Sequence, residues 1–96
     1  PGFRPADAHL LYPRAVEDTA DAAAAIHEYE AVVQGYPGEE ARARFGLLLK
    51  RHGEQARARV VFQEILDRSD AAPRYYRREQ QDWIAVAKRE LATLQD

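Results

Sequence analysis

The chain has 96 residues, of which 46% are hydrophobic and 31% are charged, and its formal net charge is −2. This size and composition are typical of one globular domain and exclude a disordered chain. The chain contains no cysteine, which excludes disulfides, thiolate nucleophiles and cysteine metal sites. No apolar stretch approaches the roughly 20 residues that a membrane-spanning helix needs.

The charge is unevenly distributed along the chain. Residues 1–40 carry two arginines against eight carboxylates, whereas residues 41–96 carry twelve basic and eight acidic side chains. Such asymmetry can steer a charged partner, although two solvated helical faces would give the same pattern.

The beginning of the chain bears on its location in the cell. Position 1 is not methionine, and the first residues lack the pattern of a secretory signal peptide. We therefore expect the chain to begin inside a longer gene product. We expect it to be cytoplasmic, or to be tethered to the inner membrane by an upstream segment.

Apolar residues at three- and four-residue steps predict helices from the N-terminus onward. The first covers about residues 6–18, with a kink or a late start at Pro13, because proline lacks a backbone donor. The second runs from Thr19 or Asp21 to Gln34, and either starting residue is a suitable N-cap. The Gly-Tyr-Pro-Gly sequence that follows predicts a turn.

Three more helices are predicted in the rest of the chain. The third covers about residues 39–52 and ends at Gly53, which is suited to a left-handed cap. The fourth covers about residues 54–68, and a short connection over 69–72 follows. A continuous final helix over about residues 73–93 is expected to bury Tyr76, Gln80, Trp83, Ala87, Leu91 and Leu94. No strand pattern is present, so the predicted fold class is all-α with antiparallel neighbouring helices.

The sequence also contains an internal repeat. Tyr12 and Phe45 are 33 residues apart, and so are Ala25 and Ala58. In both copies, an aromatic residue follows the alanine by four positions. A repeat of this period is typical of stacked helical hairpins.

The pattern resembles the tetratricopeptide repeat (TPR), in which helix A carries a Leu-Gly-like pair and helix B carries an alanine followed by an aromatic residue. In the second copy, Phe45, Gly46, Ala58 and Phe62 stand at these positions. Small residues at 46 and 58 would let the two helices approach closely, and Phe62 would fill the space beside them. The chain departs from the family pattern at His9, Pro13, Arg42 and Asp70.

The resemblance implies a single domain in a right-handed superhelical array. Its parts would be a first repeat over residues 6–38, a second over 39–72 and a capping helix over 73–96. The polar outer face of the last helix suits a cap. The segment 72–77 is also similar to divergent, uncharacterised proteobacterial TPR proteins, some of which carry an N-terminal membrane segment.

The sequence offers little for catalysis. The three histidines lack the spacing of a helical metal site. Ser69 is the only serine and lies in a predicted polar connection without a nucleophile motif. Glu39 and Glu40 lie at a helix start, where the helix dipole and solvation explain them. We therefore expect no enzyme activity, no metal and no cofactor.

In TPR proteins, helix A lines the concave side of the superhelix. The resemblance therefore implies a groove with an apolar floor and a basic rim, formed by Leu10, Arg14, Leu47, Lys50, Arg51, Arg74, Arg77, Gln81 and Ile84. An acidic, partly apolar peptide or protein would fit it, because arginine pairs with carboxylates bidentately. Family members that bind chaperone tails use a lysine and asparagines at sites where this chain has Ala43 and Leu47, so a chaperone tail is not the expected partner.

Other interpretations remain open. Leu47 and Ile84 would also suit packing against neighbouring helices. A separate alternative is that the chain is a structural or oligomerisation segment of a longer, membrane-tethered bacterial protein, and we expect either a monomer or a homodimer. A minor alternative is nucleic-acid binding through the basic and aromatic cluster at residues 74–78. No membrane contact is expected from this segment itself.

Overall fold

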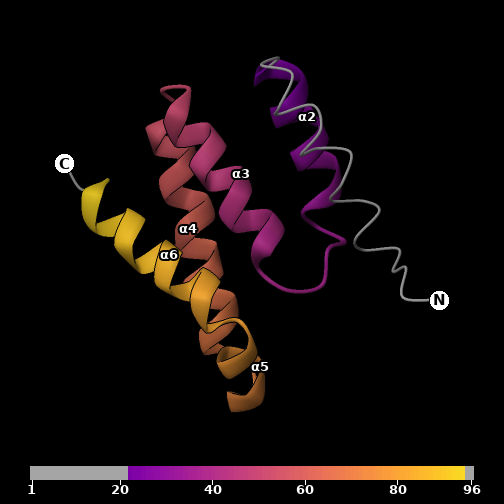
Figure 1. Cartoon of the computed structure of the whole chain (residues 1–96), viewed down its shortest axis with the longest axis vertical. Helices are drawn as coiled ribbons and strands as arrows, with labels where there is room; N and C mark the ends of the chain where they lie inside the picture. The colour runs from indigo at the N-terminus through magenta and orange to yellow at the C-terminus, as the bar shows by residue number, and fades with distance from the viewer. Residues whose placement is uncertain (1–21, 95–96) are drawn as a thin grey trace.

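The computed structural model describes residues 22–94, which form helices joined by short connections (Figure 1). The helices are α2 (Ala22–Val32), α3 (Glu40–Arg51), α4 (Gln55–Asp70), α5 (Arg74–Glu79) and α6 (Gln81–Thr93). No strand occurs in this described part, so the prediction of an all-α fold is confirmed. The helix expected over 6–18 lies outside the described residues. Between residues 22 and 94, no helix is long and apolar enough to span a membrane.

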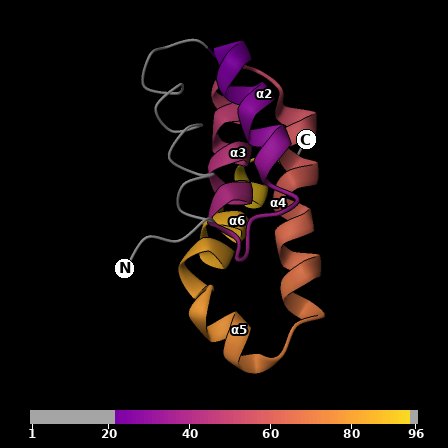
Figure 2. The ribbon, with the colours of Figure 1, turned by 90° about the vertical axis from the view of Figure 1, so that its right-hand side faces the viewer.

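Helix α3 lies at the centre of the arrangement. It packs against α4, α2 and α6, and α4 also packs against α6. Helices α2 and α6 lie on opposite sides of the α3–α4 pair (Figure 1). The turned view shows α5 below the other helices, linking the lower end of α4 to α6 (Figure 2). The centre of the fold is therefore a helix that contacts neighbours on several sides.

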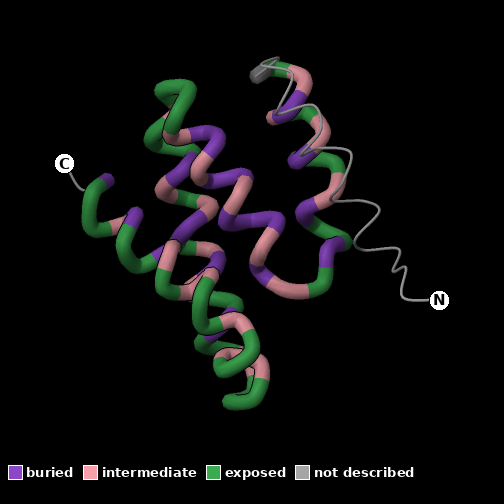
Figure 3. Tube along the Cα trace, in the orientation of Figure 1, coloured by how far each residue is buried: buried purple, intermediate pink, exposed green. Residues whose placement is uncertain are grey.

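Burial follows this arrangement. Helix α3 is mostly buried along its length, whereas exposed residues gather on the outer turns of α2, α5 and α6 (Figure 3). Ala25 and Tyr29 of α2 are fully buried, and so are Ala58 and Phe62 of α4. Residues 33 positions apart thus have the same burial. The Tyr29 ring stacks on Phe45 of α3, with 6.1 Å between ring centroids.

At Gly46, helix α3 lies close against the Phe62 side chain of α4. A Cβ atom added at this position would lie 2.7 Å from Cζ of Phe62, a distance that real Cβ atoms essentially never show. The phenyl ring therefore occupies the space that a larger residue would fill. This confirms the expectation that a small residue at 46 lets the helices approach around Phe62.

The end of α3 also agrees with the sequence-based prediction. Gly53 has a φ of 82°, in the left-handed region that favours glycine. The backbone N–H of Glu54 then donates to the carbonyl of Leu49 at 2.9 Å. This bond satisfies a carbonyl that the end of the helix would otherwise leave free.

The final helix differs from the prediction, because the helix is interrupted at Gln80. Its N–H donates to the Tyr76 carbonyl at 2.9 Å, and its own carbonyl accepts from Ile84 at 3.0 Å. Its side-chain Oε1 accepts the backbone N–H of Glu39, at the start of α3, at 2.9 Å. A tertiary bond across 41 positions thus accompanies the break, and the sequence alone carries no signal for it.

The connection predicted over residues 69–72 begins later than expected. Helix α4 continues to Asp70, so Ser69 belongs to the helix. Ser69 is buried, and its Oγ donates to the Ile65 carbonyl at 2.7 Å. This local bond satisfies a serine hydroxyl inside a helix. Serine is otherwise favoured in connections, which is why the sequence indicated a loop here.

Candidate partner-binding surface

A hollow of about 470 Å³ lies between α3 and α6. It is lined by Arg44, Leu47, Lys50 and Arg51 of α3 and by Glu90 of α6. Arg44, Leu47 and Lys50 follow one another at three-residue steps, and Arg51 follows Leu47 by four residues, which places them along one side of the helix. We call this hollow the α3–α6 groove.

One ion pair crosses the α3–α6 groove. Lys50 Nζ lies 2.5 Å from Glu90 Oε1 and 3.3 Å from Thr93 Oγ1. Glu90 is buried, and its other carboxylate oxygen lies 3.5 Å from Arg89 Nε. The pair joins the last turn of α3 to the last turn of α6. It also neutralises part of the basic charge that the sequence placed there.

Arg44 is held at the other end of the α3–α6 groove. Its Nε donates to Glu40 Oε2, one turn earlier on α3, at 3.0 Å. Its guanidinium carbon lies 5.9 Å from the centre of the Trp83 ring on α6, within the range of a cation–π contact. These contacts orient Arg44 across the boundary between the two helices.

A smaller hollow of about 280 Å³ lies along α5 and α6. It is lined by Arg77, Gln81, Ile84, Ala85 and Lys88, and we call it the α5–α6 groove. Ile84 also packs against the hydrophobic core, and Leu47 of the α3–α6 groove does the same. Leu47 and Ile84 therefore both pack against the core and line a groove, which are the two roles that the sequence left open.

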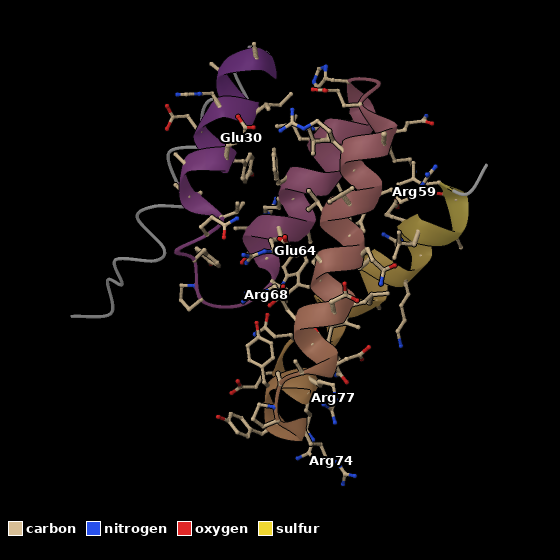
Figure 4. The ribbon with its side chains drawn as sticks, turned by 180° about the vertical axis from the view of Figure 1, so that it is seen from behind. Glu30, Arg59, Glu64, Arg68, Arg74 and Arg77 are labelled. Carbon is tan, nitrogen blue, oxygen red and sulfur yellow. The ribbon has the colours of Figure 1, made fainter. Side chains whose placement is uncertain are left out.

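The arginines of the basic cluster at residues 74–78 differ in their contacts and exposure. Arg77 Nη1 donates to the carbonyl of Ala72 at 2.6 Å and to that of Ser69 at 3.4 Å, so it caps the C-terminal end of α4. Arg74 and Arg78 are exposed, and Tyr75 is 67% exposed. Figure 4 shows Arg74 and Arg77 together at the end of the molecule formed by α5.

A buried polar network fixes α5 to the start of α3. Glu39 is fully buried, accepts a hydrogen bond from the Tyr76 hydroxyl, and lies 3.2 Å from Arg68 Nε through Oε2. Burial raises the pKa of Tyr76, and the bond to Glu39 raises it further. Burial alone would lower the pKa of Arg68, but the Glu39 charge and the hydrogen bonds raise it overall. The expectation that Glu39 is solvated at a helix start was therefore wrong.

A second buried charge lies one turn further along α3. Arg42 is only 3% exposed, and its Nε donates to Glu64 Oε1 on α4 at 2.7 Å. Its Nη1 finds no acceptor in the described part of the chain. Arg57 of α4 also pairs with Glu30 of α2, at 2.6 Å. Seen from behind, Glu30, Glu64 and Arg68 follow one another down the molecule (Figure 4). Their ion pairs join α4 to α2 and to α3 with its N-cap.

The structure places the predicted site residues in several locations. Leu47, Lys50 and Arg51 line the α3–α6 groove, and Arg77, Gln81 and Ile84 line the α5–α6 groove. Arg74 lines neither of them, and Leu10 and Arg14 lie outside the described residues.

Four of the groove residues were not predicted from the sequence: Arg44, Ala85, Lys88 and Glu90. Lys88 follows Ile84 by one helical turn, so helical spacing could have identified it. Glu90 carried no such signal, because its partner Lys50 lies 40 positions away.

The grooves suit an anionic group better than a metal ion. Their polar side chains are mainly arginines and lysines, which donate hydrogen bonds and offer no lone pair at neutral pH. Within residues 22–94, no group of three or more histidine and carboxylate side chains is placed to hold a metal.

The chain was also compared with known proteins. No protein-family model, no curated protein and no solved structure matches it. The resemblance to TPR proteins therefore stays a prediction that rests on the residues of this chain. The structure establishes the all-helical fold of residues 22–94 and the geometry of the α3–α6 and α5–α6 grooves.

Proposed function

We propose that the chain is a non-catalytic protein-interaction module that binds a peptide or a partner protein in the α3–α6 groove. The observation that carries this proposal is the lining of that groove. Among the described residues, three cationic side chains line the groove together with one apolar residue, Leu47, and one carboxylate, Glu90. An acidic, partly apolar segment would complement this surface in both charge and polarity.

The burial of residues 33 positions apart supports a TPR-like repeat. Ala25 and Tyr29 share their full burial with Ala58 and Phe62, as two copies of one structural unit would. We propose on this basis that residues 6–38 and 39–72 are two TPR-like repeats and that residues 73–96 are a capping helix. Helices α3 and α6 would then be helix A of successive units, which places the groove on the concave side.

An affinity-capture experiment tests the proposed function. The immobilised chain is compared with an Arg51→Glu variant and with an Arg78→Glu control. Both residues are exposed arginines, so the two variants change the charge equally, but only Arg51 lines the α3–α6 groove. We expect a protein partner that is retained by the parent chain and by Arg78→Glu and is lost from Arg51→Glu. A partner retained equally by all three would contradict binding in this groove.

A second candidate is nucleic-acid binding at the end of α5. The 67% exposure of Tyr75 beside the exposed Arg74 and Arg78 is the observation that favours it, because aromatic rings can stack on bases. Titration of a labelled single-stranded oligonucleotide at several salt concentrations tests it. Phosphate contacts make affinity fall steeply with salt, so affinity that is absent or independent of salt rejects this function.

A further inference from the structure

We infer that the partner of the α3–α6 groove places a carboxylate beside Lys50, and that Glu90 is an internal competitor for the same ammonium group. This inference rests on the proposed function. It adds the chemistry of the ligand at one position, and it names the residue that limits the affinity.

The ammonium group of Lys50 is accessible from the α3–α6 groove. This group has three N–H donors, of which one faces Glu90 Oε1 at 2.5 Å and another faces Thr93 Oγ1 at 3.3 Å. The Lys50 side chain is 35% exposed, whereas that of Glu90 is 10% exposed. The lysine therefore remains accessible from the groove while the carboxylate that holds it lies deeper.

Basic side chains outnumber carboxylates in the described lining around Lys50. Among the described residues, the lining of the groove holds three basic side chains, Arg44, Lys50 and Arg51, and one carboxylate, Glu90. Glu40 pairs with Arg44 one helical turn away. An incoming carboxylate that reaches Lys50 also approaches Glu90, since both acids would share one ammonium. Two carboxylates that contact the same ammonium group lie close enough to repel each other. Glu90 should therefore weaken binding of the anion that the rest of the groove attracts.

The α3–α6 groove also offers an apolar side chain to a ligand. Leu47 lies between Arg44 and Arg51 in the lining and offers an apolar contact. A segment that alternates carboxylates with apolar residues would meet both kinds of surface. We therefore use as a probe a fluorescein-labelled octapeptide of alternating aspartate and leucine, and measure its affinity by fluorescence anisotropy.

The decisive variant is Glu90→Gln, which removes the charge and keeps a side-chain oxygen that can accept from Lys50. We expect it to bind the probe about tenfold more tightly than the parent chain, a change of about 1.4 kcal/mol. The matched control is Asp82→Asn, which removes the same charge from an exposed position near the other end of α6. We expect this control to leave the affinity nearly unchanged.

A double-variant comparison separates the local effect from a general one. When Lys50→Gln is present, Glu90→Gln should no longer improve binding, because the contested ammonium is gone. An equal improvement with and without Lys50 would overturn the inference, as would an equal gain in Asp82→Asn. Unchanged or weaker binding by Glu90→Gln, with Lys50 still required, would overturn it while leaving the proposed function intact.

Two further results complete the test. If neither the parent chain nor folded Glu90→Gln binds the probe, both the inference and acidic-peptide binding in this groove are rejected. If loss of the ion pair prevents Glu90→Gln from folding, Lys50→Arg provides the second variant. Its five N–H donors can serve Glu90 and a ligand together. It should bind the probe more tightly than the parent chain, and weaker or equal binding would overturn the inference.

Discussion

At the scale of single residues, the contact between Gly46 and Phe62 gives the sharpest prediction. A Cβ at position 46 would lie 2.7 Å from Cζ of Phe62, whose side chain is fully buried. Gly46→Leu should therefore destabilise the fold by about 2–3 kcal/mol through overpacking, as measured by chemical denaturation. Gly35→Ala is the matched control, because a Cβ there meets no atom within 4 Å. A denaturation midpoint unaffected by Gly46→Leu would contradict this packing.

Tyr76 gives a second residue-scale prediction. Its hydroxyl donates to the buried carboxylate of Glu39, and hydrogen bonds to charged groups are stronger than neutral ones. Tyr76→Phe should therefore lower the free energy of unfolding by about 1.5 kcal/mol near neutral pH. Tyr75→Phe should have little effect, because Tyr75 is 67% exposed. Equal effects of the two substitutions would contradict a role for the Glu39 contact.

The contribution of Tyr76 should also depend on pH. Burial, then the bond to Glu39, raises the pKa of Tyr76 in the folded protein. The folded state thus keeps a proton that the unfolded state releases near pH 10, the ordinary pKa of tyrosine. The stabilisation is complete below about pH 10 and is lost as pH rises through the folded pKa. The stability difference between the parent chain and Tyr76→Phe should shrink in denaturation experiments above about pH 10.

At the scale of helices, the side chain of Gln80 links the break between α5 and α6 to the start of α3. Gln80→Ala would leave the Glu39 N–H without the acceptor that it now has at 2.9 Å. The expected loss is about 1–2 kcal/mol, together with faster amide hydrogen exchange in α5. Gln81→Ala is the control, because Gln81 is exposed one residue further on. Unchanged exchange in α5 after Gln80→Ala would show that other contacts hold this helix.

At the scale of the whole molecule, one hydrophobic core joins residues of α2, α3, α4 and α6. We therefore expect the described part of the chain to unfold in one cooperative transition. Trp83, the only tryptophan, lies on α6 and reports locally, whereas far-UV circular dichroism reports on all the helices. The two thermal transitions should coincide. An earlier change in Trp83 fluorescence would identify α6 as a separately unfolding unit.

The oligomeric state is a further property of the whole molecule. The sequence predicts either a monomer or a homodimer, and light scattering over a range of concentrations distinguishes them. A monomer would leave the α3–α6 groove open to a partner. A dimer that persists on dilution would favour the structural or oligomerisation role.

The sequence by itself determined the helices and much of their packing, because the signals for them are local. The apolar spacing located α3 and α4 to within two residues, and Gly53 marked the end of α3 correctly. The resemblance to the TPR pattern predicted that Phe62 packs beside the small residue Gly46, and the structure shows that contact. The same resemblance predicted that Leu47, Lys50 and Arg51 share one surface, and all three line the α3–α6 groove.

Only the tertiary structure decided which distant polar groups meet. Glu39 looked like a solvated residue at a helix start, yet Arg68, Tyr76 and Gln80 surround it from positions 29 to 41 residues away. The pairing of Lys50 with Glu90 spans 40 positions in the same way. Such contacts depend on how helices lie against one another, and neither propensity nor periodicity encodes that geometry.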